Sequence, residues 1–315
     1  MGSLYRPKGL RLQKIYYLLK PLIPRRLQVI ARRLMALYKR HAYANTWIID
    51  EESSCAPEGW RGWPEKKQFA LVLTHDVETS KGQEKCRQLV KVEKSLGFRS
   101  SFNFVPERYP VSSELRHFLE SEGFEVGVHG LYHDGKYYKS EQIFRDRATR
   151  INDYLKKWKS VGFRTPSMLH NLQWIHALNI DYDASTFDTD PFQPQPDGMK
   201  TIFPFFVRKD SMDTGYVELP YTLHQDFTLF VLLRETSIEI WKQKLDWIAD
   251  HGGMALLITH PDYMDFEGSK LYFDEYPSEY YANFLKYIKD RYEGLYWHVL
   301  PKEISRFWVS IIPNK

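Results

Sequence analysis

The chain has 315 residues, of which 43% are hydrophobic and 16% aromatic, enough for one large core or two small ones. Its two cysteines, Cys55 and Cys86, lack CxxC spacing, which excludes a disulfide framework or a cysteine-rich zinc module and favours a reducing compartment. The formal net charge of +4 is small, but its distribution along the chain is uneven.

The first 49 residues form a basic segment that is separate from the rest of the chain. They contain 11 Lys or Arg and no Asp or Glu, whereas the remainder carries 33 basic and 40 acidic residues. Pro21 and Pro24 cut off a short apolar piece at residues 15–19. After them, helical spacing of apolar residues predicts a basic amphipathic helix. These apolar residues are Leu27, Ile30, Ala31, Leu34, Leu37 and Tyr38.

Three interpretations of this segment remain open. It is a helix lying on an anionic membrane surface, a nucleic-acid arm, or a helix that packs on the acidic body. In the packed alternative its apolar face contacts the body and closes the base of a barrel; that face comprises Leu27, Ile30, Leu34 and Leu37. Nucleic acid is disfavoured because no recognition motif accompanies the charge. No stretch approaches the roughly 18 apolar residues of a spanning helix, and no cleavable signal sequence is recognisable. We therefore expect a cytoplasmic protein, with peripheral contact at the inner face of the cytoplasmic membrane as one possibility.

Residues 50–65 are rich in Gly, Pro and Trp and predict a linker or covering loop before a domain at 66–315. In that domain strand-like and helix-like segments alternate. Seven strands are expected at residues 69–75, 100–105, 124–129, 162–165, 180–185, 215–220 and 254–260. Helices are expected at 81–96, 112–121, 141–158, 171–178 and 237–250. The alternation predicts an α/β fold with parallel strands and crossover helices, closed or nearly closed into a barrel. A Pro-rich stretch at 188–213 predicts a long loop at its mouth.

His129 and His133 form an H-x-x-x-H pair just after the third expected strand. Four residues make about one helical turn, so both imidazoles can hold one metal ion if the chain coils there. The pair needs an anionic ligand, and Asp76 and Glu78 follow the first expected strand. Because α/β enzymes present catalytic groups at the carboxyl ends of their strands, these two clusters predict a metal-dependent enzyme.

Further polar residues mark the other strand ends. Arg164 lies at the end of the fourth strand, Asp183 within the fifth, and His260 at the end of the seventh. Each alone is more commonly a turn cap, a surface ion pair or a satisfied core group. Their joint occurrence at strand ends favours an active site.

In chain order, these motifs resemble the five motifs of the polysaccharide deacetylase family, the NodB-homology domain of carbohydrate esterase family 4. The matching segments are Thr74-His75-Asp76-Val77-Glu78, His129-x-x-x-His133, Arg164-Thr165-Pro166, Tyr182-Asp183-Ala184-Ser185 and Ile258-Thr259-His260. The resemblance covers about residues 66–265. It implies a distorted (β/α) barrel of about seven parallel strands, a divergent member of the family, and hydrolysis of acyl groups on sugars.

The resemblance also implies a ligand set and a base. Glu78, His129 and His133 would bind zinc or another divalent metal, and Asp76 would be the general base, held ionised by Arg164. In the family, the second Asp of the first motif is the metal ligand, and here Val77 stands in its place. Glu78, one residue further on, is therefore assigned as the ligand, and Asp76 remains the alternative.

His260 would be the general acid, with Asp183 as its orienting partner. Asp188 and Asp190 compete with Asp183 for that role. Two further departures concern loops: Gly130 replaces a Ser or Thr whose hydroxyl would pin the loop, and Met168 stands where the third motif often has Gly.

We therefore expect a zinc-dependent carbohydrate deacetylase acting on linear amide bonds. Its substrate would be an acetylated sugar, oligosaccharide or lipid-linked glycan in surface polysaccharide or glycoconjugate biosynthesis. The alternatives are a catalytically silent glycan-binding relative and a membrane-surface interaction protein acting through residues 1–49. Retention of Asp76, Arg164 and His260 favours the enzyme, because a silent binder needs no base, orienter and acid together.

Overall fold

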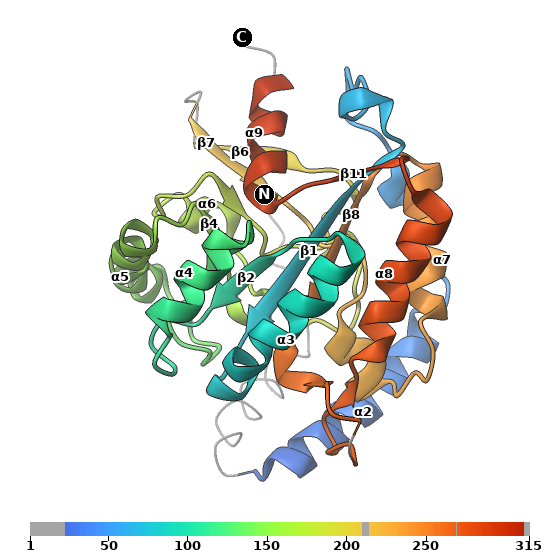
Figure 1. Cartoon of the computed structure of the whole chain (residues 1–315). Coiled ribbons are helices and arrows are strands. Elements are labelled where there is room, and N and C mark those ends of the chain that lie inside the picture. Colours follow the sequence, from blue (N-terminus) through green and yellow to red (C-terminus); the bar gives the residue numbers. More distant parts are fainter. Residues whose placement is uncertain (1–22, 210–213, 269, 312–315) are drawn as a thin grey trace, which may run out of the picture.

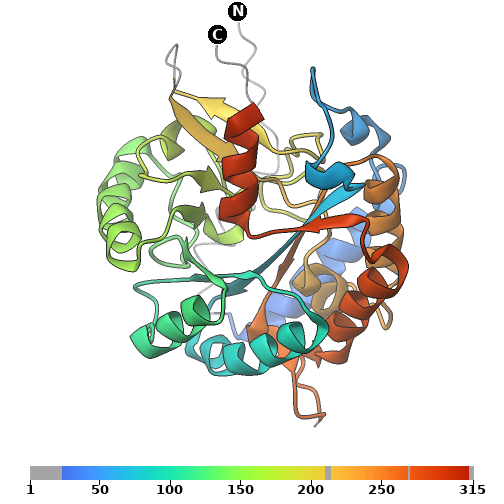
Figure 2. The ribbon, with the colours of Figure 1, turned by 45° about the horizontal axis from the view of Figure 1, so that its top comes forward.

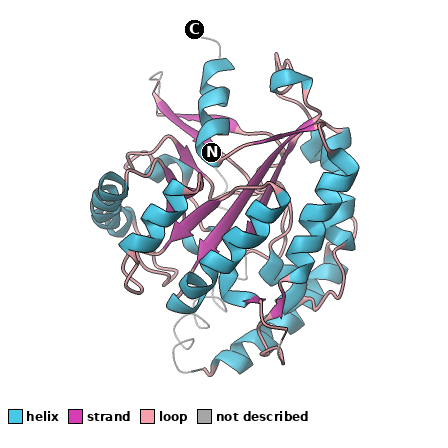
Figure 3. Cartoon of the chain, in the orientation of Figure 1, coloured by secondary structure: helices cyan, strands magenta, loops and turns pink. Residues whose placement is uncertain are grey.

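The computed structural model describes residues 23–209, 214–268 and 270–311. The apolar piece at 15–19 and five of the 11 N-terminal basic residues lie outside the described residues. The strands lie in the centre of the molecule, and helices surround them (Figures 1 and 3).

Seven parallel strands form the wall of the barrel, and they are the seven that the sequence predicts. They are β1 (Phe69–Val77), β2 (Ser101–Phe104), β3 (Glu125–His129), β4 (Gly162–Arg164), β5 (Tyr182–Asp183), β7 (Gly215–Glu218) and β8 (Met254–Thr259). β1 pairs with β8 on one edge, and the order continues through β2, β3, β4 and β5 to β7. Beyond β7 an isolated parallel bridge joins Leu223 to Leu257 of β8, which nearly closes the ring.

Two strands of the main sheet were not expected from the sequence. β6 (Phe205–Arg208) pairs antiparallel with β7, and β11 (Tyr296–His298) pairs with residues 69–71 at the start of β1. The stretch at 188–213 is therefore only partly a loop. A small separate sheet joins β9 (Met264–Asp265) to β10 (Tyr276–Pro277).

Helices cover the outside of the barrel (Figure 2). Five correspond to expected helices: α3 (Ser80–Leu96), α4 (Ser113–Ser121), α5 (Glu141–Trp158), α6 (Leu172–Ile175) and α7 (Glu239–Asp250). Two further helices, α8 (Glu279–Tyr292) and α9 (Pro301–Ile311), were not expected from the sequence. Ser112 and Ser140 cap α4 and α5 through their side-chain oxygens, as N-terminal serines commonly do.

Alternation along β1 decides which of its polar residues reach the inside of the barrel. Asp76 lies on the inner side, where it bonds Arg164 of β4. His75 lies on the other side, between Glu93 of α3 (Nε2–Oε1 2.8 Å) and Thr259 (Nδ1–Oγ1 2.7 Å). His75 is therefore a buried structural histidine.

Helix α2 (Arg25–Ala42) lies near the carboxyl ends of the barrel strands (Figure 1). Basic side chains of α2 contact the body or line the cleft there. Arg33 donates to the carbonyl oxygens of Val231 (2.8 Å) and Phe273 (2.6 Å). The prediction that a packed helix would bury its apolar face at the barrel base is wrong. The four apolar residues of the predicted contact face are 48–65% exposed: Leu27, Ile30, Leu34 and Leu37. The physical reason is charge, since an acidic body attracts the basic side of the helix. No helix in the described part of the chain is long and apolar enough to cross a membrane.

Residues 50–65 cover the opposite end of the barrel. The rings of Trp60 and Trp63 lie 5.3 Å and 6.2 Å from that of Trp308 in α9. The indole N–H of Trp63 also donates to the carbonyl oxygen of Gly252 (2.7 Å). This segment is thus packed against the barrel.

Candidate active site

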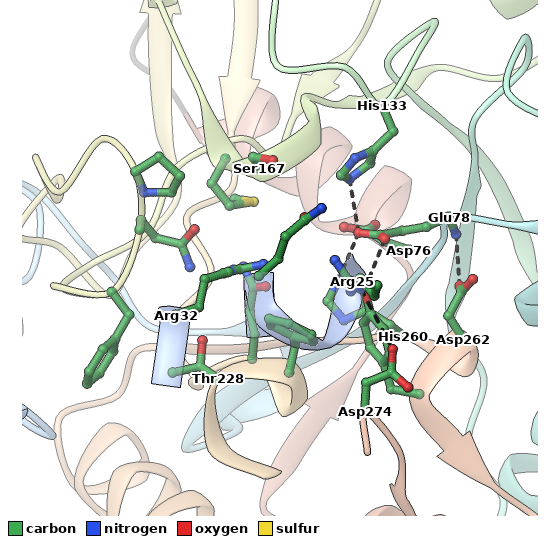
Figure 4. Close-up of a pocket in the computed structure, with 18 of the residues that line it drawn as sticks. Arg25, Arg32, Asp76, Glu78, His133, Ser167, Thr228, His260, Asp262 and Asp274 are labelled. Atoms are coloured by element: carbon green, nitrogen blue, oxygen red, sulfur yellow. Dashed lines mark hydrogen bonds and ion pairs between the residues drawn. The ribbon is translucent and has the colours of Figure 1, made fainter. Parts of the chain in front are cut away.

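A cleft of about 810 Å³ opens at the carboxyl ends of the strands, beneath α2 (Figure 4). Five of the residues predicted from the motifs line it: Asp76, Glu78, His129, His133 and His260. Helix α2 contributes cationic side chains to the same cleft: Arg25, Arg32 and Lys39. The strand ends and the N-terminal helix therefore form one site.

Glu78, His129 and His133 come together as the sequence predicts. One donor atom from each lies within 4.8 Å of the other two, and no other such group of His, Cys, Asp or Glu occurs among the described residues. His133 Nε2 lies 2.9 Å from Glu78 Oε1. One carboxylate and two imidazoles are a common ligand set for catalytic zinc.

The protonation of this cluster also fits a metal. Burial lowers the pKa of His129 to about 4, so its ring is neutral at pH 7. Its Nδ1 lies 3.2 Å from the carbonyl oxygen of Arg164, which fixes the proton there and directs the Nε2 lone pair into the cluster. Burial opposes the charge of Glu78, but His133 outweighs it and holds the pKa of that carboxyl well below its usual range. An ionised carboxylate and a neutral imidazole are the forms that bind zinc.

Asp262, which the sequence analysis did not single out, fixes the turn that carries Glu78. Its Oδ2 accepts from the backbone N–H of Glu78 (2.9 Å), and its Oδ1 accepts from the hydroxyl of Thr79. A Cβ on Gly82 would lie 2.2 Å from Asp262 Oδ2, so only glycine permits this approach. The hydroxyl of Tyr263 adds a hydrogen bond to Glu78 Oε2 (3.1 Å).

Asp76 is a buried carboxylate with two fixed donors. Arg164 and Asn103 donate to its Oδ1 over 2.9 Å and 3.0 Å, and its Oδ2 lies 3.8 Å from His129 Nε2. Burial would raise the pKa of Asp76, but the charge of Arg164 and smaller contributions from neighbouring histidines bring it to about 2. Asn103 was not predicted; a Cβ on Gly127 would lie 2.0 Å from its Oδ1, so glycine makes room for it.

Arg164 joins three strands at this point. Besides Asp76 of β1, it donates to the hydroxyl of Thr74 (2.9 Å) and to the carbonyl oxygen of Ala184 just after β5 (2.8 Å). Its side chain is 1% exposed. A guanidinium so enclosed is rigid, which supports the predicted orienting role.

His260 is oriented by Asp226, so the prediction that Asp183 orients it is wrong. Its Nδ1 lies 2.6 Å from Asp226 Oδ1, and its backbone N–H donates to Asp226 Oδ2 (2.7 Å). Burial lowers the pKa of His260, but Asp226 more than compensates and raises it to about 9. His260 Nε2 lies 4.0 Å from Glu78 Oε1, so the protonated edge of the ring faces the cluster.

Asp183 belongs to a separate buried pair, with Glu218 of β7. Its Oδ1 accepts from the hydroxyl of Ser185 (2.6 Å). Burial and the charge of Asp183 raise the pKa of Glu218 well above its usual range, so Glu218 carries a proton that it shares with Asp183. The strand order explains the error, because β5 pairs with β7, where Asp183 is in register with Glu218, and does not pair with β8.

The other two candidate partners of His260 also have different roles. Asp188 forms a buried ion pair with Lys244 (2.6 Å). Asp190 accepts from the hydroxyl of Tyr221 (2.5 Å) and from Gln193 (3.1 Å).

Two departures from the family motifs have local explanations. Gly130 has φ +66°, and a Cβ there would lie 2.5 Å from Pro166 and 2.6 Å from the Tyr137 hydroxyl. That hydroxyl accepts from the backbone N–H groups of Leu131 and Tyr132, so it pins the loop in place of a motif hydroxyl. Met168 has φ +52°, the left-handed conformation that a glycine adopts without strain.

Solved structures of other proteins share this fold, among them the following three. A Mycobacterium smegmatis protein described as a polysaccharide deacetylase superposes with a TM-score of 0.61 at 17% identity, over 82% of this chain and 97% of its own. A Pseudomonas aeruginosa PAO1 protein with the same description gives 0.60 at 15% identity, over 80% and 95%. The allantoinase Puue gives 0.61 at 14% identity, over 80% and 94%. No protein-family model and no curated protein matches the sequence.

These similarities confirm the predicted fold, a distorted (β/α) barrel of the polysaccharide deacetylase type in a divergent chain. The three structures carry two different activities in their descriptions. The fold alone therefore leaves the reaction open, and function must be argued from the site.

Proposed function

We propose that this protein is a metal-dependent hydrolase that removes an N-acetyl or other acyl group from a sugar of a glycan. One observation carries the proposal: the donor atoms of Glu78, His129 and His133 lie within 4.8 Å of one another, with Asp76 and His260 beside them. Amide hydrolysis needs a base for water and an acid for the leaving amine, and this arrangement supplies both.

The metal site and the base would act together in the first step of the reaction, the attack of water on the acyl carbon. A zinc ion held by Glu78, His129 and His133 would activate a water molecule and polarise the acyl carbonyl. Asp76 would accept a proton from the water molecule while the water oxygen bonds to the acyl carbon. The low pKa of Asp76, set mainly by Arg164 against the effect of burial, keeps it ionised and able to accept.

His260 would act in the second step, the departure of the amine. It would donate a proton from Nε2 to the amine nitrogen as the carbon–nitrogen bond breaks, which releases a free amine and a carboxylate such as acetate. Asp226 supports this role by holding Nδ1 and by keeping the imidazole protonated at neutral pH. A silent binding protein would have no need of this arrangement.

The walls of the cleft favour a sugar substrate that carries negative charge. Phe192 offers an aromatic ring of the kind that stacks on sugars, and basic residues of α2 line the same cleft, with Arg25 and Arg32 lying over the ring of Phe227. A place in surface polysaccharide or glycoconjugate assembly is part of the proposal, because such intermediates combine acetylated amino sugars with phosphate or acidic groups.

The test combines metal content with product release. Purified protein should hold close to one divalent ion per chain and should release acetate from at least one member of a panel of acetylated amino-sugar oligomers and lipid-linked sugars. The control is a His129→Ala/His133→Ala double variant, which should lose both. Unchanged metal content in the double variant would contradict the site, and metal binding without acetate release from any substrate would favour a silent binder.

A further inference from the structure

Helix α2 has two opposite faces, and only one of them is used by the fold. Its inner side buries Gln28, Val29 and Ala36 against the body. Its outer side is apolar and exposed. The large side chains there have exposed fractions of 48–71%: Leu27, Ile30, Leu34, Leu37 and Tyr38.

The exposed apolar side chains of the molecule gather around this helix. Twelve large hydrophobic residues are exposed in the described chain, and six of them belong to α2. Tyr43 follows the helix, and Leu271 and Tyr272 lie in the loop whose Phe273 carbonyl accepts from Arg33. Scattered apolar residues on a surface need no explanation, but a contiguous group at the mouth of a cleft marks a contact surface.

The basic residues of α2 form two rows, each spaced by seven residues. The first row lines the cleft: Arg25, Arg32 and Lys39. The second row lies beside the apolar face and contacts the body: Arg26, Arg33 and Arg40. One long edge of the apolar face is therefore bordered by cations.

Charge decides which partner fits this face. A second copy of the chain would bring two segments together that each hold 11 basic residues and no acidic residue, so the two would repel. A bilayer with anionic headgroups offers an apolar interior to the outer face and negative charge to the bordering arginines.

We propose that α2 docks the protein on an anionic lipid surface, with its outer face in the boundary between headgroups and acyl chains. This contact places the mouth of the cleft against the headgroups. The sugar that enters the cleft is then the headgroup of a membrane-held lipid, and the basic row of α2 lies beside the phosphate that links sugar to lipid. The part of this proposal that concerns the substrate rests on the hydrolase activity proposed above.

The docking test needs no substrate. Vesicles of phosphatidylglycerol and phosphatidylcholine should bind the full chain at low salt, pure phosphatidylcholine vesicles should bind it at least tenfold more weakly, and high salt should release part of the protein. An Ile30→Glu/Leu34→Glu variant should lose at least tenfold in binding to the mixed vesicles. The matched control is Leu295→Glu/Val309→Glu, which changes two residues of similar exposure, 47% and 50%, away from α2. Val309 lies in α9 at the opposite end of the barrel (Figure 1).

The outcomes separate docking from catalysis. Ile30→Glu/Leu34→Glu should keep its turnover of a soluble acetylated sugar and lose turnover only of the same sugar on a lipid in vesicles. The His129→Ala/His133→Ala variant should still bind vesicles, so a failed hydrolase assay leaves the docking result intact. Absence of vesicle binding at every salt concentration would overturn the proposal, as would equal loss in the control. A dimer that Ile30→Glu/Leu34→Glu dissociates, without vesicle binding, would assign the face to a second copy.

Discussion

Among single residues, Asp76 and Glu78 lie two positions apart and have opposite surroundings. Asp76 is held by Arg164 and Asn103, while Glu78 bonds His133 and the hydroxyl of Tyr263. The two carboxylates therefore have separable roles. One is fixed among cationic and amide donors, and the other faces the histidines.

Substitution by the corresponding amide should separate these roles. Asp76→Asn keeps the size of the side chain but removes the proton acceptor, so turnover should fall by roughly 10²–10⁴ while metal content stays near that of the wild type. Glu78→Gln should lower metal content first and activity with it. Metal analysis and acetate release on the same preparations provide the check. Loss of metal from Asp76→Asn would make Asp76 a ligand.

A second pair of variants tests which carboxylate serves His260. Asp226→Asn removes the charge that sustains the imidazolium, so we expect turnover to fall toward the lower end of the 10²–10⁴ range for a general acid. Asp183→Asn should change turnover only a few-fold, because Asp183 contacts Ser185 and Glu218 and not His260. Steady-state kinetics at pH 7 would distinguish the two. Equal losses in both variants would return Asp183 to the catalytic set.

The residues of the candidate site differ in how far the sequence could reveal them. His129 and His133 lie four residues apart on one segment, so their spacing alone indicates that they meet, although the chain bends at Gly130 (φ +66°) and forms no helical turn there. Asp226 follows no recognisable strand end and reaches His260 only through the fold, across 34 residues. Asn103 lies between two phenylalanines in β2, and nothing in that pattern marks it as a site residue. Local patterns identify groups on one segment, whereas partners from distant segments need the tertiary structure.

Among the elements, the seven barrel strands were predictable because strand-like and helix-like segments alternate along the chain, and because long apolar runs such as β1 and β8 end at polar residues. β11 has three residues and pairs only with the start of β1, so its sequence carries too short a pattern. β6 was concealed within a Pro-rich stretch, and only its antiparallel pairing with β7 defines it. Short edge strands are defined by their partners more than by their own residues.

The start of β3 gives the barrel a pH-dependent element. Burial raises the pKa of Glu125 to about 7, although Lys302 and Tyr182 contribute hydrogen bonds that oppose the rise. The folded state thus binds this proton more tightly than the unfolded chain does. The contribution of Glu125 to stability is fully present below about pH 4.5, its ordinary pKa, and is lost as the pH rises through about 7.

Glu125→Gln should remove this dependence. Each unit of pKa shift corresponds to about 1.4 kcal/mol, so the wild-type free energy of unfolding should fall by roughly 2–3 kcal/mol between pH 5 and pH 8 through this group. In the variant, the free energy of unfolding should lack this decrease of roughly 2–3 kcal/mol between pH 5 and pH 8. Urea unfolding at a series of pH values measures it, with Glu114→Gln, on an exposed part of α4, as the control. Identical profiles for wild type and Glu125→Gln would contradict the assignment.

For the whole molecule, residues 23–66 contact both ends of the barrel. Helix α2 borders the mouth of the cleft, and residues 50–65 pack on the base. The sequence showed that α2 is amphipathic, but not which face meets the body. Hydrophobic periodicity leaves that choice open, and here the ion pair of Arg40 with Glu235 and the carbonyl contacts of Arg33 determine it. In this helix the basic side contacts the body and the apolar face stays exposed.

Two truncations should therefore have unequal effects on stability. Removal of residues 1–44 takes away α2, which buries only Val29 and Ala36 among its apolar residues, so the melting temperature should fall by only a few degrees. Removal of residues 1–66 also deletes Trp60 and Trp63 from the aromatic cluster at the base, and should lower the melting temperature far more. A full-length Trp63→Ala variant gives the same comparison if the longer truncation does not fold. We expect a loss of about 3–5 kcal/mol in it, because it removes a buried ring and the hydrogen bond to Gly252. Thermal unfolding followed by circular dichroism provides the measurement. If removal of residues 1–44 destabilises the chain as much as Trp63→Ala does, then α2 belongs to the folding unit of the barrel and is not an element added at its mouth.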